Sequence, residues 1–231
     1  MTRAKAILLF VAAVAFALSP LFATGFNGFA PDQFPVPQVD PPIQPAGWAF
    51  SIWGLIYTWL IVSAGFGLLK RADDMEWDRM RWPLLFSLAI GASWVPVANV
   101  SPPVATVLIW LMWASAVAAL LLAPEKDRWW LAVPTALYAG WLTAASPVGT
   151  AVLATGYGAT PVLMIHAAFL LLGLALASLV LRKRPEPAYA APIIWALFGI
   201  LIANTDPLRP LMIALPVIGA ALLAWPLLRR A

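Results

Sequence analysis

The chain of 231 residues contains no cysteine, a single histidine and few charged residues. Without cysteine, the protein has no disulfide, no thiolate metal ligand and no cysteine nucleophile. Charged residues make up only 10% of the chain and hydrophobic residues 63%, which leaves too little polar surface for a soluble domain. The sequence therefore predicts an all-α integral membrane protein.

Long apolar runs, separated by charged, proline and glycine clusters, predict a bundle of about eight transmembrane helices. Two uncharged runs are too long for one helix, so we expect prolines and glycines to divide them at 99–103 and 146–158. The predicted spans are 6–23, 47–69, 83–99, 103–123, 130–147, 159–181, 190–205 and 210–228. The third and seventh have about 16–17 residues, the lower limit for crossing a membrane.

The basic residues predict how these spans are oriented. With both termini cytoplasmic, 13 of the 14 Lys and Arg residues lie on the cytoplasmic side and only Arg209 lies outside, as the positive-inside rule requires. The net charge of +4 therefore reflects topology, and we expect no nucleic-acid partner. An alternative interpretation of residues 3–23 is a cleaved signal peptide, since a basic start, an apolar run and small residues before Thr24 also fit that pattern.

The largest outer segment, 24–46, contains six prolines and only two charged residues, Asp32 and Asp40. Proline-rich chains are extended and semi-rigid. The segment is interpreted either as a lid over the outer mouth of the bundle or as a simple connector.

Ten of the 13 tryptophans fall into two groups by their position in the spans. Those beside charged cytoplasmic segments are predicted interfacial anchors, namely Trp77, Trp82, Trp129, Trp130 and Trp225. Others lie about 7–15 Å inside the outer half of the membrane, namely Trp53, Trp94, Trp110, Trp113 and Trp141. Aromatic side chains at a shared depth either line a cavity for a large, flat, apolar molecule or simply pack against helices and lipid.

Three aromatic motifs follow one another along the first five spans. They are Gly47-Trp48-x-Phe50-x-x-Trp53-x-x-x-Tyr57, then Trp94-Val-Pro96, then Pro134-x-x-x-Tyr138-x-x-Trp141. In this order they resemble motifs in the second, third and fifth helices of the TspO/MBR family, the tryptophan-rich sensory proteins related to the mitochondrial translocator protein. The resemblance covers residues 5 to about 148. The chain departs from the family at Gly91 and Val148, where asparagine is usual, so the resemblance does not imply the family's polar ligand contacts here, while the aromatic frame is kept.

The resemblance implies a TspO-like five-helix region over 1–148, with the Pro-rich outer loop 24–46, followed by an additional three-helix region over 149–231. It implies an outer pocket for a hydrophobic planar or lipid-like ligand, such as porphyrin, haem or a sterol-like lipid, in a sensor, regulator or transporter of such molecules. The lining residues that it implies are Trp48, Phe50, Trp53, Tyr57, Trp94, Tyr138 and Trp141. The depth of Trp110 and Trp113 makes these two further candidates.

Ionisable side chains are almost absent from the predicted spans. His166 stands seven residues into the sixth span, and we interpret it as an interhelical hydrogen-bonding residue rather than an obligatory ligand of haem iron. No Asp, Glu, Lys or Arg falls within a span, which disfavours a proton-coupled carrier and an enzyme. We therefore expect no catalytic residue, no metal site and no obligatory cofactor, with a tetrapyrrole as one candidate ligand.

The alternative function is a facilitative transporter or permease subunit for an amphipathic molecule, which needs a second mouth on the cytoplasmic side. We expect a multi-pass protein of a cell membrane, and of a bacterial inner membrane in particular, with lipids as partners. Small residues such as Ala114 and Ala118 permit the close helix contact of a homodimer.

The distribution of basic residues generates a topology prediction. Fused after Ala231, a reporter enzyme that works only in the cytoplasm should be active. Inserted near Gln38, a reporter enzyme that works only outside the membrane should be active. Paired cytoplasmic and outer reporters at both positions measure this. An outer location of the C-terminal fusion would contradict the span count.

Overall fold

The computed structural model of the protein describes residues 2–22 and 26–228. Its helices are α1 (Thr2–Leu18), α2 (Ile52–Lys70), α3 (Met75–Val100), α4 (Pro102–Leu122), α5 (Ala132–Gly156), α6 (Val162–Lys183), α7 (Pro187–Ala203) and α8 (Pro210–Leu228). Short 3₁₀ turns add η1 (Ser19–Phe22), η2 (Pro31–Gln33) and η3 (Gly47–Ser51). Within these described ranges the protein has no strand, which confirms the all-α prediction.

Six helical segments are long and apolar enough to cross a membrane, namely Thr2–Phe22, Gly47–Lys70, α3, α4, α5 and α6. The helices α7 and α8 are also apolar but shorter, with 17 residues in α7. The eight helices agree in number and order with the eight predicted spans. The prediction of a multi-pass helical membrane bundle is therefore confirmed.

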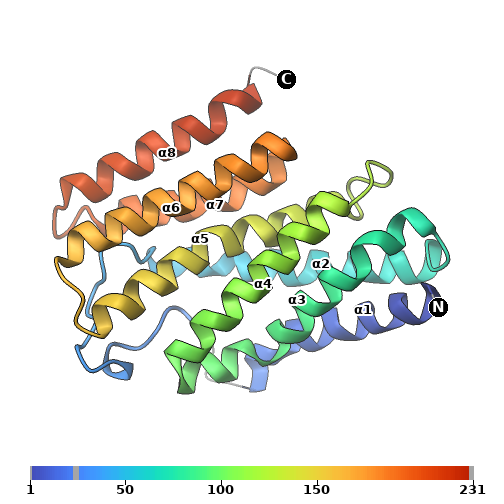
Figure 1. Ribbon diagram of the computed structural model, residues 1–231, viewed down its shortest axis with the longest axis horizontal. Helices are drawn as coiled ribbons and strands as arrows, with labels where there is room; N and C mark the ends of the chain where they lie inside the picture. Colours follow the sequence, from blue (N-terminus) through green and yellow to red (C-terminus); the bar gives the residue numbers. More distant parts are fainter. Residues whose placement is uncertain (1, 23–25, 229–231) are drawn as a thin grey trace.

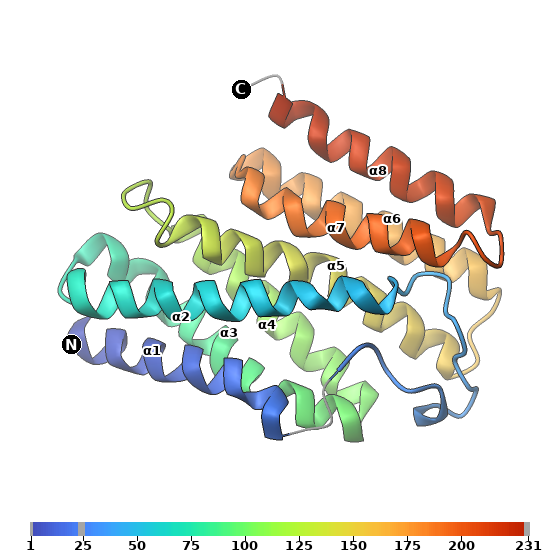
Figure 2. The same cartoon turned by 180° about the vertical axis from the view of Figure 1, so that it is seen from behind.

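The helices lie side by side, with α1 at one edge of the bundle and α8 at the other (Figure 1). Contacts run from α1 to α2 and α3, from α3 to α4, and from α4 to α5, which also packs on α2, α6 and α7, while α8 packs mainly on α7. The described chain begins and ends at the same end of the bundle, and the segment 26–46 runs across the opposite end (Figure 2). An even number of crossings requires this arrangement.

The predicted end of the fifth span at residue 147 is wrong, because α5 continues to Gly156. Pro147 lacks the N–H of one helical hydrogen bond, but prolines persist inside membrane helices where neighbouring helices and hydroxyl side chains support the backbone. Here Pro147 faces Gly173 of α6, and Ser146 Oγ donates to the carbonyl of Leu142 at 2.8 Å. The division predicted near residue 148 thus falls in the middle of a helix.

The predicted start of the third span at residue 83 is also displaced, since α3 begins at Met75. The Asp74 carboxylate caps this helix by accepting from the backbone N–H groups of Glu76 (2.9 Å) and Trp77 (3.4 Å). The first turns carry charged residues and extend beyond the apolar run. An apolar run therefore marks the part of a helix within the membrane and not the end of the helix.

One predicted interfacial anchor is wrong: Trp77 is only 2% exposed. Its Nε1 donates to Asp127 at 3.1 Å, so the ring packs inside the bundle rather than at a lipid boundary. The other four predicted anchors, Trp82, Trp129, Trp130 and Trp225, are exposed, as lipid-facing anchors must be.

Among the six long apolar helical segments, α5 is the most enclosed. In its apolar stretch 67% of the residues are buried, against 28–44% in the other five segments. Small residues allow this close packing. A Cβ atom at Gly140 would overlap the carbonyl oxygen of Tyr189 in α7, so only glycine permits this approach. The Tyr189 hydroxyl in turn shares a 2.7 Å hydrogen bond with Thr143 of α5. The contact between α5 and α7 is therefore both close and polar.

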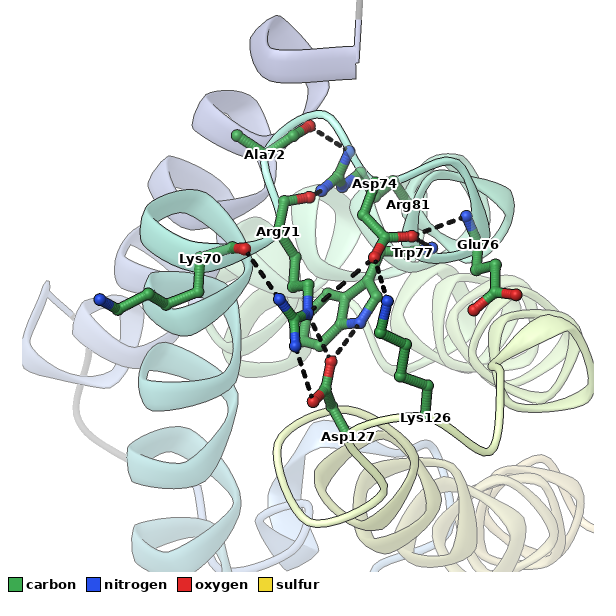
Figure 3. Close-up of polar contacts among 9 residues, drawn as sticks. All are labelled: Lys70, Arg71, Ala72, Asp74, Glu76, Trp77, Arg81, Lys126 and Asp127. Carbon is green, nitrogen blue, oxygen red and sulfur yellow. Dashed lines mark hydrogen bonds and ion pairs between the residues drawn. The ribbon is translucent and has the colours of Figure 1, made fainter.

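Charged side chains tie together the loops at the end of the bundle opposite segment 26–46 (Figure 3). The Arg71 guanidinium donates to both carboxylate oxygens of Asp127, at 2.6 and 3.2 Å, and Lys126 donates to Asp74 at 3.0 Å. The hydrogen bonds from Arg71 and Trp77 hold the pKa of Asp127 below its usual value, and that from Lys126 does so for Asp74. These pairs join the α2–α3 loop to the α4–α5 loop.

Arg81 closes the same end from inside, with a side chain that is 1% exposed. Its guanidinium donates to the carbonyl oxygens of Arg71 (2.5 Å), Ala72 (2.9 Å) and Thr2 (3.3 Å). The carbonyls at the end of a helix have no partner within that helix, and an arginine side chain can supply one. Arg81 therefore caps the end of α2 and attaches the start of α1.

Replacing Arg81 with methionine should lower the free energy of unfolding by about 1–3 kcal/mol, because the Ala72 carbonyl and the Asp78 carboxylate each lose a hydrogen bond from the guanidinium. Thermal unfolding in detergent measures this. The matched control is Arg79→Met, which removes the same charge from an exposed side chain two residues away and should be nearly neutral. Equal destabilisation by the two variants would show that net charge, and not the capping contacts, is responsible.

Candidate functional site

Aromatic side chains from α1, α2 and α5 meet in the middle of the bundle. Trp53 and Tyr57 of α2 are stacked, with ring centroids 5.1 Å apart. Phe16 of α1 meets Tyr57 edge-on at 4.9 Å and Tyr138 of α5 at 5.7 Å. Trp141, one turn along α5 from Tyr138, meets Trp53 edge-on at 6.1 Å. Edge-to-face and offset pairs at these distances are favourable ring geometries.

A second set of rings connects this group to the outer segment 26–46. Phe50 of η3 meets Trp141 at 5.9 Å. Phe26 of the outer segment meets Trp94 of α3 at 4.7 Å, Phe50 at 6.2 Å and Phe29 at 5.3 Å. The two sets form one aromatic cluster, which comprises Phe16, Phe26, Phe29, Phe50, Trp53, Tyr57, Trp94, Tyr138 and Trp141.

The aromatic cluster surrounds two cavities. The main cavity, of about 50 Å³, has the aromatic lining Phe26, Phe29, Phe50, Trp94 and Trp141, completed by small residues of α5. The side cavity, of about 120 Å³, lies towards α1, where Phe26, Phe50 and Trp94 form a wall common to both cavities and Trp53 and Tyr57 complete the lining. The site is thus a divided apolar space beneath the outer segment.

Five of the nine residues predicted to bind a ligand line these cavities, namely Phe50, Trp53, Tyr57, Trp94 and Trp141. Tyr138 lies against them, fully buried, with its hydroxyl 2.9 Å from Ser87 Oγ. The structure places the other three elsewhere. Trp110 and Trp113 of α4 donate from Nε1 to Thr150 and Thr143 of α5, each at 2.9 Å, and Trp48 packs on Trp195 of α7 at 4.9 Å.

Sequence reasoning missed Phe16, Phe26 and Phe29 as members of this site. Phe16 is one apolar residue among many in its helix, and nothing in its pattern sets it apart. A signal did exist for Phe26 and Phe29, because aromatic residues in a proline-rich segment with few charges need an apolar surface to cover. Together with Gln44 and Pro45, they make the outer segment a wall of the main cavity.

Hydrogen bonds to three helices hold the outer segment in place. They are Gln33 Nε2 to the carbonyl of Ala98 in α3 (2.9 Å), the N–H of Val36 to the carbonyl of Gly156 in α5 (3.0 Å), the N–H of Ala46 to the carbonyl of Gly199 in α7 (3.1 Å), and Asn204 Nδ2, just beyond α7, to the carbonyl of Pro42 (2.8 Å). Each joins neutral groups and is worth on the order of 1 kcal/mol. The segment is therefore ordered, and displacing it breaks only neutral hydrogen bonds and apolar contacts.

His166 of α6 adds a fully buried attachment for the outer segment. Its Nδ1 accepts the backbone N–H of Ile43 at 3.3 Å, and its Nε2 lies 3.1 Å from Thr155 Oγ1. The neutral ring therefore carries its hydrogen on Nε2, and the Thr155 hydroxyl donates onward to Gln38 Oε1 at 2.7 Å. Both ring nitrogens are engaged by the protein, which agrees with an interhelical hydrogen-bonding role.

The arrangement defines the class of protein: a multi-pass helical membrane protein with an aromatic cavity closed by its first long loop. A family model described as TSPO-like protein matches residues 5–228, and the chain belongs to this family. No curated protein and no solved structure matches the chain significantly. The sequence motifs carry the resemblance only to about residue 148, whereas the family match continues through α6, α7 and α8.

His166→Ala should retain the binding of both haem and metal-free protoporphyrin, because both ring nitrogens already have protein partners. Its stability should fall by about 0.6 kcal/mol, and at most about 1.7 kcal/mol, for each of the two hydrogen bonds lost, the average and the maximum for interhelical hydrogen bonds in membranes. Absorption titrations and thermal unfolding measure the two quantities. Thr155→Val, which breaks the same network without touching a metal ligand, is the control. Loss of haem binding alone in His166→Ala would identify the histidine as an iron ligand.

Proposed function

We propose that this TspO-type membrane protein binds a hydrophobic planar or lipid-like ligand, of the porphyrin, haem or sterol class, beneath its outer segment. It acts as a sensor, regulator or transporter of that ligand and not as an enzyme. The main cavity and the side cavity together form the binding site. The aromatic faces that surround them suit stacking on a flat apolar molecule.

The main support for this proposal is the hydrogen-bond donor of Trp141, which is unpaired within the described part of the chain. Its ring lines the main cavity, yet its buried Nε1 has no hydrogen-bond partner among the described residues. The Nε1 of Trp94, on the same cavity, donates to the carbonyl of Ala105 at 2.9 Å. A buried donor without a partner costs about 1–3 kcal/mol. A ligand with a carbonyl, carboxylate or ring-nitrogen acceptor would remove that cost.

The small size of the two cavities bears on how a ligand enters. Pockets for small molecules have volumes of roughly 300–1,000 Å³, whereas the main cavity has about 50 Å³ and the side cavity about 120 Å³. Phe26, on the wall between them, occupies space that a ligand ring would need. Binding therefore requires the outer segment to move and to carry Phe26 away from Trp94.

The geometry favours binding over the alternative of a facilitative transporter or permease subunit. A carrier needs a second mouth, but the other end of the bundle is closed by the buried Arg81 and by the ion pairs around Asp127. Displacing charged, hydrogen-bonded groups costs more than displacing neutral ones. A single mouth at the outer segment suits a sensor or regulator.

We place the protein in a cell membrane, and by expectation in a bacterial inner membrane, with lipids as its surroundings. We also propose a homodimer. On α4, Ala114 is exposed and Ala118 is partly exposed one turn later, so the helix presents small side chains on one face.

Trp53→Ala and Trp141→Ala should each weaken protoporphyrin binding by about 1–3 kcal/mol, the range for loss of stacking on a flat ligand. Tryptophan fluorescence quenching on titration with protoporphyrin measures the affinity. Trp129→Ala, which removes a 63% exposed ring at the opposite end of the bundle, is the control and should bind normally. Equal losses in all three variants would indicate general destabilisation instead of a site.

A further inference from the structure

A third cavity lies on the other side of α5, lined by α5, α6, α7 and Ile43 of the outer segment. This α6 cavity has a volume of about 30 Å³, and every residue that lines it is apolar, including Pro147, Phe169, Gly173, Leu174, Ile193 and Leu197. Cavities with apolar walls stay dry and accept apolar atoms. The α6 cavity is therefore suited to hydrocarbon and to nothing polar.

The α6 cavity and the main cavity share part of their lining. Ala144 and Val148 of α5 and Ala196 of α7 line both. These side chains are small, so a single thin layer of methyl groups separates the two spaces. The main cavity and the α6 cavity are thus neighbours, with only small side chains of α5 and α7 between them.

A glycine keeps the α6 cavity open. Gly173 of α6 faces Pro147 of α5, and a Cβ atom at Gly173 would lie 3.4 Å from Pro147 Cγ and 3.7 Å from the carbonyl oxygen of Thr143. These are ordinary contact distances, so an alanine fits there and occupies space that is now empty. The helix could carry a larger residue at this position, yet the space is left unfilled.

We infer that the ligand carries an alkyl or isoprenoid tail, which passes between Ala144 and Ala196 into the α6 cavity while its ring occupies the main cavity. The inference rests on the proposed function, because it assumes a ring beside Trp141. The α6 cavity is too small for a ring, and its apolar walls favour the burial of methyl and methylene groups. The ligand class is thus a planar ring with a hydrogen-bond acceptor and a hydrocarbon tail. On this basis α6 and α7 form part of the binding site.

A pair of glycine substitutions tests the tail separately from the ring. Gly173→Ala fills the α6 cavity, whereas Gly149→Ala adds a methyl group to the main cavity, 3.7 Å from Phe29 Cε2. Both glycines lie within helices, where alanine is the better helix former, so both variants should fold.

The probes are methyl pheophorbide a and pheophytin a, which share a chlorin ring and differ only in a methyl or a phytyl ester. Full-length protein in lipid nanodiscs is titrated by tryptophan quenching against empty nanodiscs.

Gly173→Ala should weaken pheophytin a binding roughly 4- to 15-fold, the effect of excluding one or two buried methylene groups, and leave methyl pheophorbide a unchanged. Gly149→Ala should weaken both probes. Leu174→Ala, which enlarges the α6 cavity, should strengthen pheophytin a alone. The tail inference is overturned if Gly173→Ala leaves pheophytin a binding unchanged, or weakens the binding of both probes equally. The ring site still stands in either case, provided that Gly149→Ala weakens the binding of both probes. If the unsubstituted protein binds neither probe, both proposals are overturned.

Discussion

The close packing of α5 against its neighbours is the constraint on which the rest of the structure depends. Gly140 brings its backbone against the carbonyl of Tyr189, so that α7 lies directly on α5. The next residue, Trp141, reaches the aromatic cluster, and Ala144 and Val148, one and two turns further along, form the thin wall between the main cavity and the α6 cavity. A bulkier residue at position 140 would separate the two helices and with them the walls of both cavities.

The two ends of the bundle are held by different chemistry, and this difference bears on function. At one end, buried and partly buried charges such as Arg81 and Asp127 hold the loops through charge-assisted hydrogen bonds. At the other end, the outer segment is held by neutral hydrogen bonds, such as that from Ile43 to His166, and by the rings of Phe26 and Phe29. Ring contacts can be exchanged for contacts with a flat ligand, whereas ion pairs cannot. The outer end is therefore the end suited to open.

Much of the fold follows from the sequence because apolar runs and charged clusters are strong signals in a membrane protein. Among the described residues, the eight helices, their order and the long segment before α2 are predicted correctly. The errors in helix boundaries occur where the prediction depends on one residue or one short stretch. The proline at 147 predicts a helix end that packing against Gly173 prevents, and the charged start of α3 is excluded because it lies outside the apolar run. The depth of Trp53, Trp94 and Trp141 also follows from their positions along the helices.

The sequence by itself determined that the chain is a multi-pass helical membrane protein, and it predicts a shared depth for several aromatic residues and one side of the membrane for 13 of the 14 basic residues. Only the tertiary structure decided which aromatic residues face one another. Trp110 and Trp113 share the depth of the cavity but lie outside the lining identified for it, while Phe16 and Phe26 complete the cluster from α1 and the outer segment. The physical reason is that lipid and protein interior are both apolar. A membrane helix is then apolar all round, and its sequence does not specify which side turns inward.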